Sequence, residues 1–244
     1  QNVGRWWNDR IALEEVSLTL AAGERIAIIG PSGSGKSTLM RLLGGALSPS
    51  KGQVLVDGQN LEDCSPGEIQ RHRASMGVIA QGGALVPQLS VHRNVTAGRL
   101  ANWPWYKTLA SLVWSLEKER THELLATVGL ADRQWDKTSI LSGGQQQRVA
   151  IARALAGCPE VILADEPTNG LDPNTAQEVV SDMLSRVENE QLTFIMSTHW
   201  VSLARNKVTR LIGLREGRVF FDIPAAELTE ELLDALYEGS RERR

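Results

Sequence analysis

The stretch from Gly30 to Thr38 has the residue types and spacing of a phosphate-binding loop, G-x-x-x-x-G-K-[ST]. Glycines let the backbone approach phosphate oxygens closely, and consecutive N–H groups form an anion-binding nest. We expect Lys36 to reach the β- and γ-phosphates of a nucleotide and the Ser37 hydroxyl to bind Mg²⁺. A short apolar run precedes the loop and a helix is expected after it, which favours nucleotide binding over a glycine-rich surface loop. The residues of the loop are Gly30, Pro31, Ser32, Gly33, Ser34, Gly35, Lys36, Ser37 and Thr38.

Two adjacent acids, Asp165 and Glu166, follow another short apolar run at 161–164. A carboxylate at the C-terminal end of a strand, beside a phosphate loop, can hold Mg²⁺ directly or through water, and we expect this role of Asp165. Glu166 is then placed to orient and deprotonate an attacking water. An acidic pair after a strand also occurs as a turn or a helix cap. The phosphate loop in the same chain is what favours the catalytic interpretation.

A second anion site is expected where residues 141–148, LSGGQQQR, open a helix that runs to about Ala156. Ser142, Gly143 and Gly144 would present a hydroxyl and backbone N–H groups at the start of that helix. Taken alone, these residues are more typical of a capped helix with a flexible start. Two phosphate-binding helix starts in one chain are most simply explained if two chains face each other and each supplies half of a site.

Short apolar runs alternate with longer helical stretches over most of the chain, which indicates an α/β protein. The run at 26–29 is continuously apolar and ends in glycine, as suits a strand buried in a parallel sheet. Helices are expected from Lys36 to about Gly44 and over 227–237. The expected strands are 11–20, 25–29, 53–56, 76–80, 161–164, 193–196, 211–214 and 218–221.

From about Val91 to Ala156 the pattern changes to helical periodicity with little strand signal. We therefore expect a helical sub-domain inserted into an α/β core. One face of a helix is predicted from the spacing of Trp105, Leu109, Leu112, Val113 and Leu116.

The composition of the 244 residues is that of an ordinary folded protein, with room for one large domain or a domain with an insertion. Hydrophobic residues make up 42% and charged residues 23%, which excludes a disordered chain. The formal net charge of −3 argues against a general nucleic-acid binder, and no apolar run is long enough to span a membrane. Cys64 and Cys158 are expected to be reduced thiols. Because Gln1 is not an initiator methionine, we expect a trimmed start.

The run LSGGQQQR resembles the signature of ABC ATPases, the nucleotide-binding subunits of ABC transporters, and the other motifs of that family are present in order. GPSGSGKST resembles the Walker A loop, VILADEP the Walker B strand, and residues 171–173 the D-loop. Gln81 matches the Q-loop and His199 the switch histidine. This resemblance covers nearly the whole chain. It implies an α/β fold with a P-loop NTPase core of RecA-like type, an antiparallel β sub-domain and an inserted helical sub-domain, and it implies hydrolysis of ATP with Mg²⁺.

The resemblance also implies roles for single residues. Glu166, His199 and Gln81 would be catalytic, and Ser37, Gln81 and Asp165 would bind Mg²⁺. Ser142, Gly143, Gly144 and Gln145 would contact ATP on the opposite subunit, and Asp172 would belong to the D-loop. Trp7 would stack on adenine, with Trp6 as the alternative. A lone histidine after a strand is otherwise usually a satisfied polar residue, and Trp200 stands where many ABC ATPases carry an acid.

The implied organisation is a single ABC ATPase domain over 1–244. Its nucleotide-binding core would comprise 1–82 and 157–222, its helical signature sub-domain 83–156, and its C-terminal helical tail 223–244. The implied partners are a second copy of the chain in a homodimer, integral-membrane permease subunits, and indirectly a periplasmic substrate-binding protein, with no nucleic acid. The implied location is peripheral, at the cytoplasmic face of the bacterial inner membrane. Residues 82–95 would form the groove for a permease coupling helix, with Leu85, Val86 and Leu89 as its apolar contacts.

Two stretches resemble more specifically the ATPase of phosphonate and phosphite importers: RLIGLREGRVFFD at 210–222, and NWPWY at 102–106 with the apolar helix after it. Trp103, Trp105 and Trp114 are expected to be the core of a helical hairpin, and the alternative is contact with a permease loop. Other ABC complexes stay open as alternatives, namely those for lipoprotein release, export or cell division, and soluble ABC proteins that act on nucleic acid or ribosomes.

Overall fold

The computed structural model describes residues 1–8 and 10–238, apart from the side chains of Leu112 and Leu203. The chain divides into two units. The first comprises Gln1–His72 and the chain from Thr193 onward, and the second comprises Arg73–Leu192. In the described part, no helix has the length and apolar character needed to cross a bilayer.

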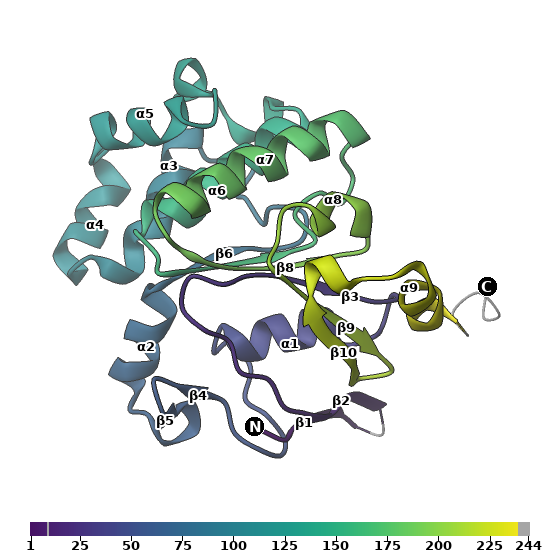
Figure 1. Cartoon of the computed structure of the whole chain (residues 1–244). Helices are drawn as coiled ribbons and strands as arrows, with labels where there is room; N and C mark the ends of the chain where they lie inside the picture. Colours follow the sequence, from purple (N-terminus) through teal and green to yellow (C-terminus); the bar gives the residue numbers. More distant parts are fainter. Residues whose placement is uncertain (9, 239–244) are drawn as a thin grey trace. The chain divides into compact units, whose positions relative to one another are not determined.

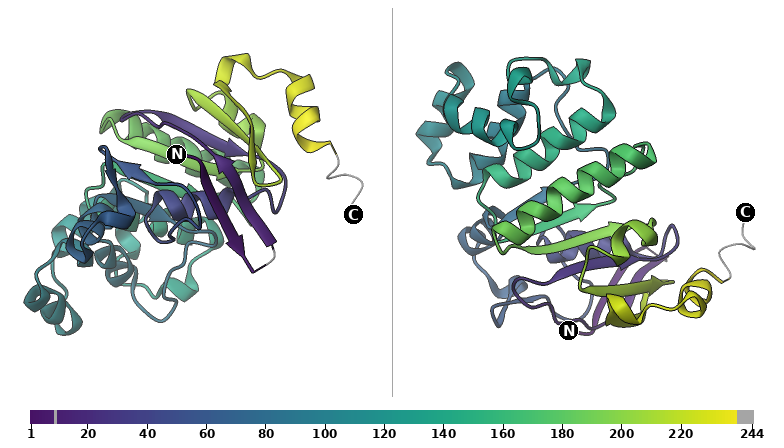
Figure 2. Two further views of the ribbon diagram at one scale, coloured as in Figure 1. Left: turned by 90° about the horizontal axis from the view of Figure 1, so that it is seen from below. Right: turned by 45° about the horizontal axis from the view of Figure 1, so that its top comes forward.

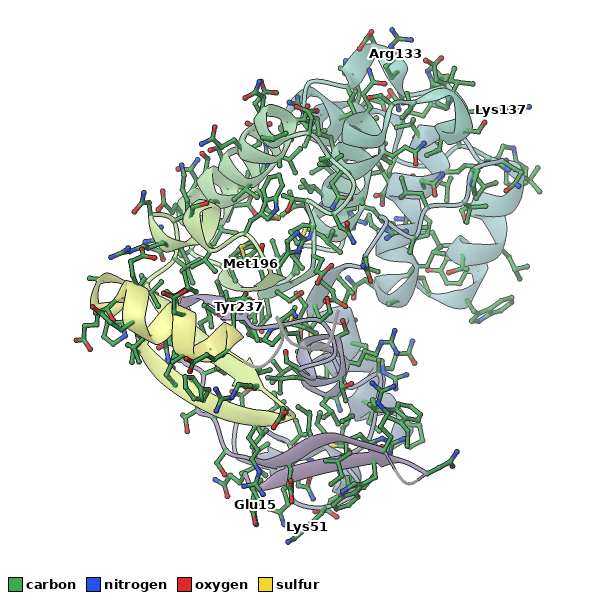
Figure 3. All side chains as sticks on the ribbon, turned by 90° about the vertical axis from the view of Figure 1, so that its right-hand side faces the viewer. Glu15, Lys51, Arg133, Lys137, Met196 and Tyr237 are labelled. Carbon is green, nitrogen blue, oxygen red and sulfur yellow. The ribbon has the colours of Figure 1, made fainter. Side chains whose placement is uncertain are left out.

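The core of the first unit is built on β3 (Arg25–Ile29), the continuous apolar run (Figure 1). This strand pairs in parallel with β8 (Thr193–Thr198) on one side and with β9 (Arg210–Arg215) on the other. An antiparallel strand, β10 (Arg218–Pro224), extends the sheet beyond β9. Residues 26–29 are at most 1% exposed, because a strand in the middle of a parallel sheet is covered on both faces. Met196 of β8, labelled in Figure 3, is fully buried in this core.

Smaller elements complete the first unit. A two-stranded antiparallel ribbon, the purple pair in Figure 2, precedes β3 in the sequence. Helix α1 follows β3. Helix α2 (Pro66–Ala74) leads into the second unit. The remaining bounds are β1 (Val3–Trp7), β2 (Arg10–Val16), α1 (Lys36–Leu43), β4 (Leu55–Val56), β5 (Gln59–Asn60), η1 (Leu61–Asp63), α8 (Val201–Arg205), η5 (Ala225–Glu227) and α9 (Glu230–Tyr237).

The second unit holds a parallel pair of strands, β6 (Met76–Ile79) and β7 (Val161–Asp165), with a helical region between them in the sequence. Helices α6 (Gly143–Ala156) and α7 (Pro173–Asn189) run side by side (Figure 2). The other helices of this unit are α3 (Val91–Thr96), η2 (Ala97–Asn102), α4 (Trp105–Val113), α5 (Lys118–Ala126), η3 (Ala131–Arg133) and η4 (Thr138–Ile140).

Most predicted elements are confirmed, often to within two residues at each end. The helix after the phosphate loop, the signature helix and the helical region from Val91 to Ala156 are all observed. The predicted strand 11–20 ends at Val16, and β1 and β5 were not predicted. Residues 239–244 of the predicted C-terminal tail lie outside the described residues. The predicted division into core, helical sub-domain and tail follows other boundaries than the two units and stays a prediction.

Helix α4 corrects the expectation of a tryptophan-lined hairpin core. Trp103 is buried, but Trp105 is 76% and Trp114 64% exposed. The predicted apolar face is also turned to solvent, since Leu109 and Val113 are exposed, and α4 ends at Val113, before Leu116. Spacing correctly predicted a helix with an apolar face, but spacing does not say what covers that face.

Candidate functional site

The predicted phosphate loop lies in the first unit, between the end of β3 and the start of α1. Gly30 and Gly35 have φ values of +151° and +104°, which side-chain-bearing residues rarely adopt. A Cβ at Gly30 would overlap the Leu214 carbonyl oxygen, and one at Gly35 would lie 2.6 Å from the Ala12 carbonyl oxygen. Both positions therefore require glycine, and the neighbouring strands fix the path of the loop.

The start of α1 fits an anion. Its N-cap is Gly35, with no side chain that could cap the helix, so the positive end of the helix dipole is open to a ligand. Lys36 is buried, and its Nζ donates to the carbonyl oxygens of Gly30 (2.8 Å) and Pro31 (3.0 Å). The ammonium group is thus folded back over the loop, within the reach of a phosphate held there. Ser37 and Thr38 follow in the first turn of α1, both half-buried.

Trp7 ends β1 and is the more exposed of the two candidate adenine platforms. Its side chain is 48% exposed, whereas Trp6 is half-buried with its ring over Gly4. The Arg5 guanidinium carbon lies 4.4 Å from the centre of the Trp7 ring, a cation–π contact. One face of the indole is therefore covered from within the protein, and a base could stack on the other face.

His199 directly follows β8 and is exposed. Trp200 packs edge-on against the imidazole, with ring centres 6.1 Å apart. The Thr198 hydroxyl accepts a hydrogen bond from the Trp200 N–H (3.0 Å). The indole of Trp200 therefore packs against the histidine, at the position where the sequence has tryptophan and not an acid.

The second unit brings Gln81 and Glu166 together. Asp165 is the last residue of β7, and Glu166 follows it with a φ of +47°, which is uncommon for a residue other than glycine. Oε2 of Glu166 accepts hydrogen bonds from the side-chain amides of Gln81 (3.2 Å) and Asn169 (3.3 Å). Two amides thus orient the predicted general base, and a strained backbone at such a position is typical of functional sites.

The signature segment starts α6 with a capping box. The Ser142 hydroxyl accepts from the Gln145 N–H (3.3 Å), and the Gln145 side-chain oxygen accepts from the Ser142 N–H (3.0 Å). A Cβ at Gly144 would lie 2.6 Å from Cγ2 of Thr175, so this glycine allows close packing against α7, and Gly143 precedes it at the first helical position. The helix is capped by its own residues, and the hydroxyl hydrogen of Ser142, which is not used in that cap, remains a donor.

Asp172 is the N-cap of α7. Its carboxylate accepts from the Thr175 N–H (3.1 Å), and hydrogen bonds from the Thr175 hydroxyl and N–H hold the pKa of Asp172 below its ordinary value. This predicted D-loop residue therefore carries a negative charge at the positive end of α7, where a carboxylate is stabilised.

The predicted Mg²⁺ ligands are a hydroxyl, an amide and a carboxylate. Ser37 belongs to the first unit, and Gln81 and Asp165 belong to the second. Such oxygen donors suit a hard cation, and Mg²⁺ is usually bound through one or two carboxylates together with substrate phosphates. Among the described residues, no group of three His, Cys, Asp or Glu side chains is arranged as a metal site.

Three contacts of these residues were not anticipated from the sequence. Asn169 lies three residues after Glu166, in the loop before α7, where no pattern singles it out. Gly217, in the turn between β9 and β10, donates its N–H to the Ser34 carbonyl oxygen (3.1 Å). Arg153 of α6 donates to the loop that follows Gln81. The contact of Asn169 with Glu166 lies in a loop, and the other two contacts join residues far apart in the sequence. Hydrophobic periodicity detects neither kind of contact.

The chain matches known families and structures over most of its length. Residues 13–169 match the family model described as ABC transporter. Two curated relatives are the phosphonates import ATP-binding proteins PhnC 2 of Pseudomonas aeruginosa and PhnC of Lactobacillus gasseri. The first is 43% identical over 93% of this chain and 85% of its own, and the second is 38% identical over 95% and 89%.

Solved structures resemble the chain equally broadly. The dimeric bacterial ABC transporter cassette MJ0796 is 33% identical, with a TM-score of 0.81 over 92% of this chain and 97% of its own. The protein cbiO1 of Clostridium perfringens, part of the ABC transporter complex cbiONQ, is 28% identical, with a TM-score of 0.79 over 99% and 94%. The expected P-loop fold of an ABC ATPase is thereby confirmed.

Proposed function

The chain belongs to the ABC transporter family, and from that premise we propose that it hydrolyses ATP to drive a bacterial importer of phosphonate or phosphite. The observation that carries the proposal is the 38–43% identity, over more than nine tenths of the chain, to relatives named as phosphonate import ATP-binding proteins. The phosphate loop and the Gln81–Glu166 pair supply the chemistry that such a subunit needs.

In the proposed reaction, one set of side chains binds the nucleotide and another acts on the attacking water. Lys36 and the N–H groups of the loop bind the phosphates of ATP, and Trp7 stacks on the adenine. Ser37 and Asp165 would hold Mg²⁺, with Gln81 as a further ligand, and this ion would neutralise charge on the phosphates. Glu166 accepts the proton of the attacking water, while Gln81 orients that water and His199 donates to the γ-phosphate.

A second copy of the chain would complete the site. Ser142, Gly143, Gly144 and Gln145 of one copy would face the ATP bound by the loop of the other, with Asp172 beside them. The Ser142 hydroxyl hydrogen and the dipole of α6 support this role, because both favour an anion. The similar MJ0796 cassette was solved as a dimer, which supports a homodimer for this chain.

The chain would work with permease subunits at the cytoplasmic face of the inner membrane, and indirectly with a periplasmic binding protein. Relatives named for import support this assignment. Residues 82–95 would receive a permease coupling helix. Val86 is exposed there, and Leu85 and Leu89 are half-buried, so apolar surface is available for a partner.

Complementation tests the transport function directly. We would express the chain in a bacterium whose own phosphonate-importer ATPase has been deleted but whose permease and binding protein are kept, and measure growth with phosphonate as the sole phosphorus source. Growth with the wild-type chain, and none with Glu166→Gln, is the expected result. Mg-ATPase activity of the purified chain without growth on phosphonate or phosphite would point to export, lipoprotein release or cell division.

A further inference from the structure

Arg153 connects the signature helix to the loop that follows Gln81. It lies in the last turn of α6, and its guanidinium donates to the carbonyl oxygens of Ala84 (Nη1, 2.7 Å) and Gly83 (Nη2, 2.7 Å). Burial lowers the pKa of Arg153, so the two carbonyl contacts replace water that the charged group has lost. A planar guanidinium can bind two converging acceptors at once, which a lysine ammonium on its flexible stem does poorly.

The loop that Arg153 binds has an unusual backbone. Gly82, Gly83 and Ala84 are all left-handed, with φ values of +70°, +74° and +44°. Glycine adopts such values readily, but alanine does so only at a cost in energy. Three successive left-handed residues therefore need support from outside the loop. The short, charge-assisted bonds from Arg153 provide that support at the two carbonyl groups of Gly83 and Ala84.

Gln81 lies in a tight turn directly before the carbonyl groups that Arg153 binds. The Gly83 N–H donates to the Ala80 carbonyl oxygen (2.9 Å), so a tight turn contains Gln81 and Gly82. Strand β6 holds the start of the turn, and Arg153 holds its end. The side chain of Gln81 is thereby directed at Glu166, to which it donates at 3.2 Å.

We propose that Arg153 is a positioning residue for ATP hydrolysis, which acts by holding the Gln81 turn so that Gln81 meets Glu166. The inference rests on the proposed function, because it needs Gln81 and Glu166 to serve the reaction. On this proposal α6 also couples the signature segment to the Gln81 turn. One rigid helix carries Ser142 at its start and Arg153 roughly 16 Å further on, so a movement of the signature segment would reach the Gln81 turn through the helix.

A double-mutant cycle on the full-length chain tests this. We would measure kcat and KM for Mg-ATP with Arg153→Met in the wild-type and in the Gln81→Ala background. In the wild-type background we expect kcat to fall about ten- to a hundredfold, as for an active group displaced by about 1 Å, with KM changed less than about threefold. In the Gln81→Ala background the same substitution should lower kcat less than about twofold, because Arg153 acts through the missing side chain.

Arg186→Met is the control. Arg186 lies near the end of α7, outside the segments assigned to the site, and donates to Glu190 (3.3 Å) rather than to the Gln81 turn. It should leave kcat within about threefold of the parent enzyme in each background. Should Arg153→Met not fold, Arg153→Lys replaces it, with a smaller loss of kcat that again disappears in the Gln81→Ala background.

Equal losses of kcat for Arg153→Met in both backgrounds would overturn the inference, because Arg153 would then act independently of Gln81. So would an unchanged kcat in an otherwise active enzyme. The proposed function itself fails if the wild-type chain hydrolyses no ATP, or if the Lys36→Ala variant hydrolyses ATP as fast as the wild type. Either result is known before any Arg153 variant is measured.

Discussion

Replacement of Glu166 by glutamine separates proton transfer from the other contacts of this side chain. Glutamine has nearly the same shape as glutamate. In the structure, Oε2 of Glu166 accepts from Gln81 at 3.2 Å and from Asn169 at 3.3 Å, and an amide oxygen can accept both bonds. The backbone φ of +47° is about equally unfavourable for either residue. The variant should therefore keep the local structure.

What Glu166→Gln loses is the ability to take a proton at neutral pH. A general base typically contributes about 10²–10⁴-fold to the rate, so kcat should fall by that factor, which is roughly 3–5 kcal/mol in activation free energy. The free energy of unfolding should change by less than about 0.5 kcal/mol, because both hydrogen bonds at Oε2 can be kept. ATP binding should be retained, since the phosphate loop is untouched.

The assay combines turnover with light scattering in Mg-ATP. ATP bound between Lys36 of one chain and Ser142 of the other would join two copies, so blocked hydrolysis should accumulate an ATP-loaded dimer of Glu166→Gln. Asp165→Asn should act differently, because it weakens Mg²⁺ binding and so impairs assembly of the site. Full turnover by Glu166→Gln would refute the assignment, as would a monomeric Glu166→Gln with bound Mg-ATP together with a dimeric Asp165→Asn.

Three further predictions concern the nucleotide and the second copy. Lys36→Ala should weaken ATP binding about ten- to a hundredfold, measured by titration with a fluorescent ATP analogue, because a charged hydrogen bond contributes about 1.5–3 kcal/mol. Trp7→Ala should weaken it by about 1–3 kcal/mol and Trp7→Phe by much less, whereas a loss seen only with Trp6→Ala would identify the neighbouring ring as the platform. A mixed dimer of one Lys36→Ala chain and one Ser142→Ala chain has one intact site, so it should keep about half of the wild-type turnover if the two sites act independently. Absence of any cross-link between Ser142 and the phosphate loop of the opposing chain, with ATP bound, would contradict the shared site.

The fold could be predicted from the sequence wherever local pattern and burial agree. Strand β3 is an apolar run because it is covered on both faces, and α1 begins at Lys36, directly after the glycine that allows the loop its turn. The capping box of α6 is equally local, since Ser142 and Gln145 are three residues apart. Such signals are contained in a few neighbouring residues and need no tertiary structure.

Tertiary contacts are what the sequence did not predict. The strand predicted over 11–20 stops at Val16, because pairing with β1 ends there and alternation alone does not fix a strand end. The support of the Gln81 turn by Arg153 joins residues about seventy positions apart, which no periodic pattern encodes. Resemblance to a family predicted Gln81, Glu166 and His199 as a set. The hydrogen bond between Gln81 and Glu166 is a property of the folded unit.

The exposed apolar face of α4 should govern how the purified chain behaves in water. Trp105, Tyr106, Val113 and Trp114 are between 63% and 76% exposed, and apolar surface gathered in this way favours self-association, more so in sulfate salts. Aggregates formed through α4 should therefore increase with ammonium sulfate and persist when EDTA removes Mg²⁺, unlike a dimer held by Mg-ATP. The double substitution Trp105→Ser and Val113→Ser should raise the ammonium sulfate concentration at which the chain precipitates, and it should leave nucleotide-dependent dimerisation intact.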